Sequence, residues 1–81
     1  MRRGPGTPID LTLGQNLRSL RASKGLPLRD LAKLLDVTFQ QIHKYESGQN
    51  RISVPLLIEI CQTLDVPIAV LLEGIEGIRL V

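Results

Sequence analysis

The stretch LRDLAKLLDVTFQQIHKYES, from Leu28 to Ser47, carries the clearest structural signal in this chain. Residues 27–36 have apolar side chains at helical spacing, and Pro27 suits the first turn of a helix because its missing N–H would be unpaired there. Thr38 can cap a second helix over residues 39–47, and Gly48 can end it. Two short helices joined by a turn of three or four residues predict a helix-turn-helix.

A helix is also expected ahead of this motif, because apolar residues recur at helical spacing at Leu13, Leu17 and Leu20. Asp10 or Thr12 can cap its start, and Gly25 ends it. Gly14 lies inside the helix, where glycine costs about 1 kcal/mol relative to alanine. We therefore expect another segment to approach this position closely.

The second half of the chain predicts two further helices. Ser53 caps a helix over residues 54–65, with Pro55 in its first turn, and Pro67 starts a short fifth segment. No useful length of sequence before the C-terminal residues alternates at period two, as a half-buried strand would. The expected fold class is all-α, with about five short helices.

Composition limits the chain to one domain with a small aliphatic core, since it has 81 residues of which 43% are apolar. It contains no run of ~18 uncharged apolar residues, as a transmembrane helix would need, and MRRGPGTP lacks the apolar segment of a secretory signal. Cys61, as the single cysteine, cannot form an internal disulfide, which fits a reducing compartment. We expect a cytoplasmic protein with no membrane partner.

Charge is distributed unevenly along the chain. Residues 1–51 carry nine Lys and Arg against four Asp and Glu, a net charge of +5, whereas residues 52–81 carry one against four, a net charge of −3. A basic front half suggests a polyanionic partner, although a solvated face with a chance imbalance explains the numbers equally well.

The predicted helix over residues 39–47 has two distinct faces. Its inner side contains Ile42, Tyr45 and Glu46. Its outer side contains Gln40, His43, Lys44 and Ser47, with Phe39 and Gln41 at the edges. Glutamine can bond the N6/N7 edge of adenine, lysine suits guanine or a phosphate, and phenylalanine can contact a thymine methyl group. The outer side therefore has the chemistry of a DNA-reading surface, although Phe39 could instead belong to the core.

Three segments of the sequence, LGQNLRSLRASKGL, DLAKLLDVTFQQIHKYESGQNRI and LLIEICQTLDVPIAVLLEG, carry a family resemblance. The chain resembles the lambda repressor and Cro type of bacterial and phage helix-turn-helix regulators from about Ile9 to Gly74. The resemblance implies a five-helix bundle that binds double-stranded DNA, usually as a dimer on a palindromic operator. We expect a flexible basic arm over residues 1–8, the DNA-binding domain over residues 9–74 and an apolar tail over residues 75–81.

The resemblance also implies roles for individual residues. Base contacts are expected from Phe39, Gln40 and Lys44. Contacts with the DNA backbone are expected from Thr38, Gln41, His43, Ser47, Asn50 and Arg51. Arg21 and Glu46 match a structural ion pair between the first helix and the recognition helix. Two positions depart from the family: Leu28 replaces a glutamine that often binds phosphate, and Asp36 replaces a glycine in the turn, where aspartate tolerates the left-handed conformation.

Three functional hypotheses follow. The first is a sequence-specific regulator, a repressor acting as a homodimer through its C-terminal part. The second is an antitoxin-type module that neutralises a toxin, with the tail as the protein-binding part, and binds its own promoter. The third is an enzyme, which the sequence disfavours, because it has no phosphate-binding glycine loop, no metal-ligand cluster and no nucleophile paired with a base. We expect no cofactor, no metal and no catalytic residue, with Cys61 a buried thiol.

Overall fold

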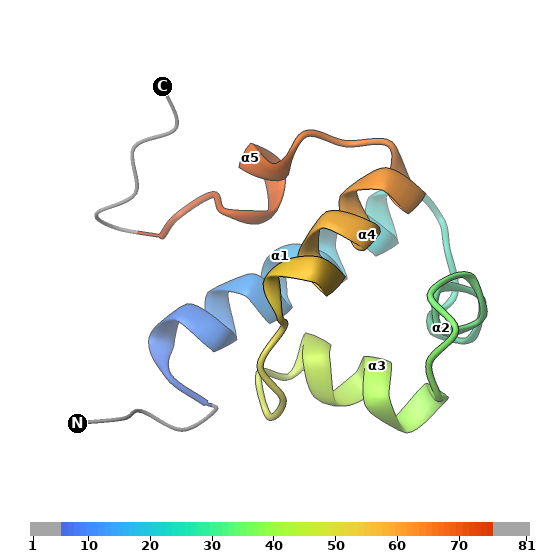
Figure 1. Cartoon of the computed structure of the whole chain (residues 1–81), viewed down its shortest axis with the longest axis horizontal. Helices are drawn as coiled ribbons and strands as arrows, with labels where there is room; N and C mark the ends of the chain where they lie inside the picture. The colour runs from blue at the N-terminus through green and yellow to red at the C-terminus, as the bar shows by residue number, and fades with distance from the viewer. Residues whose placement is uncertain (1–5, 76–81) are drawn as a thin grey trace.

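The structure is a computed structural model that describes residues 6–75, and these residues form five α-helices and no strand (Figure 1). The helices are α1 (Pro8–Ser23), α2 (Leu28–Leu34), α3 (Phe39–Glu46), α4 (Val54–Leu64) and α5 (Ile68–Leu71). The predicted all-α class is confirmed, and α2 and α3 form the predicted helix-turn-helix. The expected tail over residues 75–81 lies outside the described residues except for Ile75.

The arrangement of the helices leaves one side of α3 open. Helix α3 packs against α1 and α2, whereas α5 packs against α1 and α4. In Figure 1, α3 lies at the lower edge of the molecule and α5 at the upper edge, with α1 and α4 between them. The outer side of α3 is therefore not covered by any other described helix.

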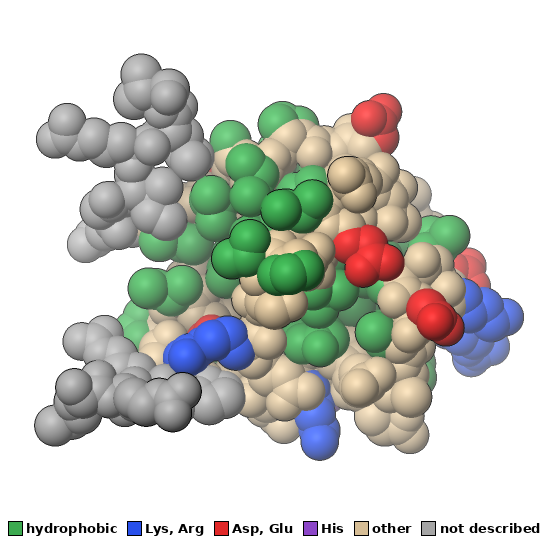
Figure 2. All heavy atoms as spheres, viewed as in Figure 1, with side chains coloured by type: hydrophobic (Ala, Val, Ile, Leu, Met, Phe, Trp, Pro, Cys, Tyr) green, Lys and Arg blue, Asp and Glu red, His purple; other side chains and the backbone are tan. Residues whose placement is uncertain are grey.

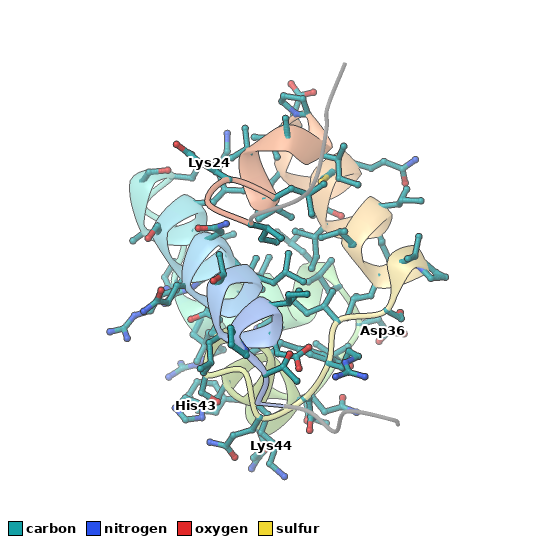
Figure 3. The ribbon with its side chains drawn as sticks, turned by 90° about the vertical axis from the view of Figure 1, so that its left-hand side faces the viewer. Lys24, Asp36, His43 and Lys44 are labelled. Atoms are coloured by element: carbon teal, nitrogen blue, oxygen red, sulfur yellow. The ribbon has the colours of Figure 1, made fainter. Side chains whose placement is uncertain are left out.

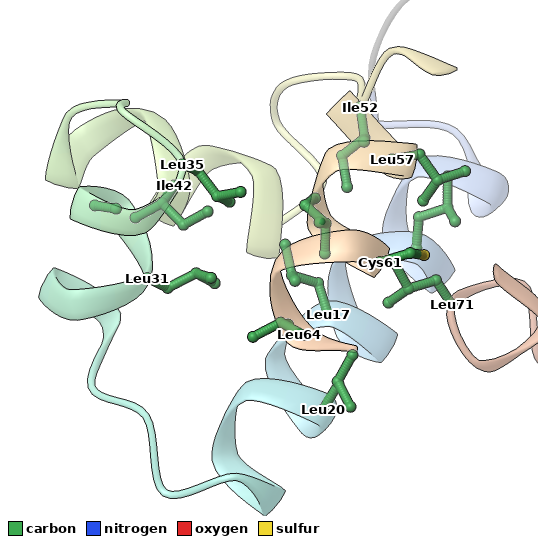
Figure 4. Close-up of a cluster of buried hydrophobic side chains, with 13 residues drawn as sticks. Leu17, Leu20, Leu31, Leu35, Ile42, Ile52, Leu57, Cys61, Leu64 and Leu71 are labelled. Carbon is green, nitrogen blue, oxygen red and sulfur yellow. The ribbon is translucent and has the colours of Figure 1, made fainter. Parts of the chain in front are cut away.

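The core is aliphatic, as the composition predicts, and every helix contributes to it. The largest fully buried side chains are Leu17, Leu31, Ile42, Ile60 and Leu71, one from each helix. Figure 4 shows the buried hydrophobic cluster to which they belong. Burying a side chain of this size stabilises the fold by about 1.5–3 kcal/mol. The same core therefore holds α3 in place and draws α5 onto the bundle.

The start of α1 differs from the sequence-based prediction. Neither Asp10 nor Thr12 is the N-cap; Thr7 is, with Pro8 in the first turn. The hydroxyl of Thr7 accepts a hydrogen bond from the Asp10 amide, and the Asp10 carboxylate accepts one from the Thr7 amide at 3.1 Å. Asp10 thus closes a reciprocal capping box three residues after the cap, which explains why the cap lies earlier than expected.

Helix α2 begins one residue later than predicted, so Pro27 precedes the helix and is not in its first turn. It is the N-cap of α2, with φ −60° and ψ 150°, and the helix proper begins at Leu28. Since an N-cap residue has an extended backbone, a proline with φ near −65° fits this position.

The turn between α2 and α3 has the predicted conformation. Asp36 adopts φ +55°, a left-handed conformation that aspartate tolerates better than most residues. Thr38 is the N-cap of α3, and Gly48, with φ +79°, follows the end of that helix. The predicted start and end signals of α3 are confirmed.

Candidate nucleic-acid interface

The outer side of α3 presents the predicted group of polar side chains. Gln40, His43 and Lys44 are exposed, and Figure 3 shows His43 and Lys44 pointing away from the body of the molecule. Phe39 is 51% exposed, so the alternative that it belongs to the core is wrong. Phe39 is the first residue of α3, whereas Ile42, three residues later, is buried.

These side chains surround one shallow hollow. It has a volume of about 350 Å³ and is lined by Phe39, Gln40, His43, Lys44 and Gln49. The structure therefore brings together the three residues expected to contact bases, Phe39, Gln40 and Lys44. It also adds Gln49, which the sequence analysis did not select.

The start of α3 is held rigidly. The Thr38 hydroxyl accepts a hydrogen bond from the Gln41 amide at 3.1 Å, and the side-chain oxygen of Gln41 accepts one from the Thr38 amide at 2.9 Å. Both residues are exposed, and they form a capping box. The side-chain nitrogen Nε2 of Gln41 takes no part in this box, so it can still donate a hydrogen bond to a phosphate.

The loop after α3 folds back onto the end of the helix. The backbone N–H of Asn50 donates to the Lys44 carbonyl at 3.1 Å, and the Ser47 hydroxyl donates to the same carbonyl at 3.2 Å. Ser47 and Asn50 are half-buried. Ser47 is the C-cap of α3 and Asn50 follows in the loop, and their contacts with the DNA backbone stay a prediction.

Arg51 is also placed beside this loop, but it is part of an ion pair that the sequence analysis did not predict. Its Nε donates to Oδ1 of Asp10 at 3.1 Å, and its Nη2 donates to Oδ2 at 3.2 Å. Asp10 is buried, whereas the Arg51 side chain is about half exposed. The hydrogen bonds from Arg51 lower the pKa of the Asp10 carboxyl against the opposing effect of its burial.

Arg21 and Glu46 form the second ion pair. Arg21 Nε donates to Oε2 of Glu46 at 2.6 Å and Nη2 donates to Oε1 at 3.1 Å, while Nη1 donates to the Leu26 carbonyl at 2.9 Å. Glu46 is largely buried. The pair joins α1 to α3 and has the geometry of a structural contact.

A second hollow lies beside this ion pair, with a volume of about 230 Å³. It is lined by Arg18, Arg21, Leu28, His43, Glu46 and Ser47. Glu46 neutralises Arg21, but Arg18 is exposed and no acid lining the hollow pairs with it in the described structure. The sequence analysis missed Arg18, although its position three residues before Arg21 puts both on one side of a helix.

The described residues contain no group of three potential metal ligands. Cys61 is buried, as predicted, and burial raises the pKa of its thiol. Among the same residues, none of the helices is long and apolar enough to cross a membrane.

Comparison with known proteins identifies relatives of this chain. Residues 17–71 match the helix-turn-helix family HTH_3. A protein of Rickettsia prowazekii named as an HTH-type transcriptional regulator is 48% identical over 68 residues, which cover 84% of this chain and 52% of that protein. The chain therefore spans about half the length of such relatives.

Two solved structures share the fold. The clp gene regulator ClgR from Corynebacterium glutamicum superimposes with a TM-score of 0.76 at 36% identity, covering 79% of this chain and 83% of that one. SinR, a master regulator for biofilm formation solved in complex with DNA, superimposes with a TM-score of 0.68 at 27% identity, covering 75% of this chain and 98% of that one. The Rickettsia prowazekii relative, ClgR and SinR are all named as regulators.

Proposed function

The chain belongs to the helix-turn-helix family of DNA-binding transcriptional regulators, and we propose that it is a sequence-specific repressor that inserts α3 into the major groove as a homodimer. One observation carries the proposal: Phe39, Gln40, His43, Lys44 and Gln49 surround a single hollow on the uncovered side of α3. A helix held by a capping box at its start and an ion pair at its end can present these groups without further ordering.

Base reading is assigned to the first turns of α3. Gln40 can make a two-point contact with adenine, and Lys44 suits guanine O6 and N7. The exposed Phe39 ring can lie against a thymine methyl group, which gives a half-exposed aromatic side chain a role outside the core.

The contacts with phosphates are assigned to the residues around this helix: Arg18, Thr38, Gln41, His43, Ser47 and Asn50. The half-buried Leu28 cannot take the role of the family's glutamine, and it lines the same hollow as the exposed Arg18. We therefore assign the missing backbone anchor to Arg18. Phosphate contacts fix the register of the protein on DNA without reading sequence.

The homodimer is assigned to the part of the molecule remote from α3. Figure 2 shows hydrophobic side chains gathered over α4 and α5 on one face. Val54 and Ile58, four residues apart on α4, are 66% and 45% exposed, and Ile68 on α5 is 39% exposed. An exposed apolar patch usually marks an interface. Leu71 on α5 is buried in the core and is not available to a partner.

A two-fold pairing of this kind suits a palindromic operator. It can hold two copies of α3 about 34 Å apart, one turn of DNA. The net negative charge of residues 52–81 fits a surface turned away from phosphates. Such a regulator acts in the cytoplasm, where its DNA is.

Selection of bound duplexes from a random pool tests the proposal directly. We expect enrichment of one sequence with two-fold symmetry, and binding that weakens steeply with salt, because each neutralised phosphate contributes about −0.9 to the log–log slope. No enrichment, or binding that does not respond to salt, would refute sequence-specific recognition. The toxin-neutralising alternative gains no support, since none of the relatives reported above is named as an antitoxin.

A further inference from the structure

The first turn of α1 is tied to the loop that follows α3. Asp10 makes two hydrogen-bonded contacts with Arg51, at 3.1 and 3.2 Å. One residue further along α1, the backbone of Leu11 lies so close to Gly48 that a Cβ on Gly48 would be 3.1 Å from the Cα of Leu11. The two contacts hold residues 48–51 from both ends.

The ion pair is placed where it can control this loop. The Asp10 carboxylate is almost completely buried, and it is already oriented by hydrogen bonds from the amide and the hydroxyl of Thr7. Its position is therefore fixed by the helix start, and Arg51 follows it. A planar guanidinium held at two points cannot rotate about one bond as a lysine could.

We propose that Asp10 is a positioning residue for DNA binding: through Arg51 it holds the loop of residues 48–51 in the conformation that places Gln49 and Asn50 against DNA. The inference rests on the proposed function, because that function makes DNA the ligand of the loop. Asp10 itself touches no DNA. The backbone bond from the Asn50 amide to the Lys44 carbonyl is the contact that the ion pair protects.

The direction in which Asp10→Asn changes DNA affinity separates this role from a purely electrostatic effect. Asp10→Asn raises the net charge by one unit from +2, and removing an acid from a DNA-binding protein strengthens the non-specific attraction to phosphates. A positioning role predicts the opposite result. The amide keeps the size of the side chain and can still accept from Thr7, so the variant tests the link with Arg51.

The experiment measures operator affinity at a temperature where melting curves show every variant folded. The matched control is Glu59→Gln, which makes the same charge change on an exposed side chain of α4. We expect Asp10→Asn to bind about tenfold more weakly, a change of about 1.4 kcal/mol, while Glu59→Gln binds as tightly as the wild type or slightly more tightly. Affinity of Asp10→Asn equal to or above that of the control would overturn the proposal.

Arg51→Lys gives an independent arm, because it keeps the charge and loses the two-point geometry. Because both substitutions break the same ion pair, the variant that combines Asp10→Asn with Arg51→Lys should bind the operator no more weakly than the weaker of the two single variants. Additive losses would overturn the positioning role. Hydrogen exchange at the Asn50 amide should be faster in both variants without DNA, and unchanged exchange would also overturn it. A wild-type chain that binds no DNA would instead defeat the proposed function.

Discussion

Gly14 and Glu46 are in direct backbone contact: a Cβ built on Gly14 would lie 2.5 Å from the Glu46 carbonyl oxygen and 2.6 Å from that of Tyr45. Helix α1 therefore crosses the end of α3 at a distance that only glycine permits. The Arg21–Glu46 ion pair bridges the same two helices. Together these contacts fix the angle at which α3 leaves the body of the domain.

Gly14→Ala should destabilise the domain, although alanine is the better helix former by about 1 kcal/mol. The added methyl group meets backbone oxygens that cannot rotate away, so we expect a loss of about 1–3 kcal/mol in the free energy of unfolding. Ser19→Ala, at an exposed position of the same helix, should change it by about 0.5 kcal/mol or less. Chemical denaturation measures the free energy of unfolding of both variants, and equal values for Gly14→Ala and Ser19→Ala would contradict the close contact at Gly14.

Asp10 gives stability a defined dependence on pH. Its folded-state pKa is lowered by the hydrogen bonds from Arg51, so as pH falls the unfolded chain takes up the proton first. The stability that Asp10 contributes is present above the ordinary aspartate pKa, about 3.9, and is lost as pH falls through the folded-state value. Asp10→Asn should flatten this part of the acid-denaturation curve, with Glu59→Gln as the matched control. Parallel curves for wild type and Asp10→Asn would contradict the assignment.

Features set by short-range sequence were predictable. The cap at Thr38, the stop at Gly48 and the buried Ile42 each depend on residues within one or two turns, and the structure has all three. The close contact at Gly14 was also predictable, because a glycine inside a helix is unfavourable unless another segment requires it.

Other features depend on residues that are distant in sequence. Asp10 and Arg51 are 41 positions apart, and no periodicity or motif joins them. The cap at Thr7 was missed because the Gly- and Pro-rich start favoured an arm over a helix. Arg18 and Gln49 enter the candidate site only when α1 and the loop after α3 are folded beside that helix.

Gln40→Ala and Lys44→Ala should leave the fold intact and change DNA recognition. Both side chains are exposed, so stability should change by about 0.5 kcal/mol or less. Loss of a two-point contact from Gln40 should weaken binding by about 1–3 kcal/mol and relax the preference at one base pair. Melting and binding curves on the same samples separate the two effects. Unchanged affinity and specificity in both variants would mean that another surface reads the DNA.

Arg18→Ala should weaken binding to all DNA sequences equally, because a phosphate contact carries no sequence information. The magnitude of the salt slope should fall by about 1, the share of one phosphate. Lys24→Ala is the matched control: Figure 3 shows Lys24 at a distance from His43 and Lys44, so its slope should match that of the wild type. A slope for Arg18→Ala that equals the control would remove Arg18 from the interface.

Sedimentation tests whether the chain dimerises through the α4 and α5 face. Ile58→Asp places a charge in the exposed apolar patch, which would be buried and unpaired in a dimer, so we expect dissociation to monomers at micromolar concentration. Leu34→Asp makes the same change at an exposed apolar residue of α2 and should not alter the association.

A chain ending at Gly74 separates the helices from the apolar residues that follow. If the shortened chain still dimerises, the contact lies on α4 and α5; if it becomes monomeric, the C-terminal residues supply it. A full chain that remains monomeric at high micromolar concentration, and also on DNA, would defeat the homodimer. In that case the exposed pair Val54 and Ile58 would have to contact a different partner. A palindromic operator would no longer be required, because the symmetry of the half-sites follows from the symmetry of the protein.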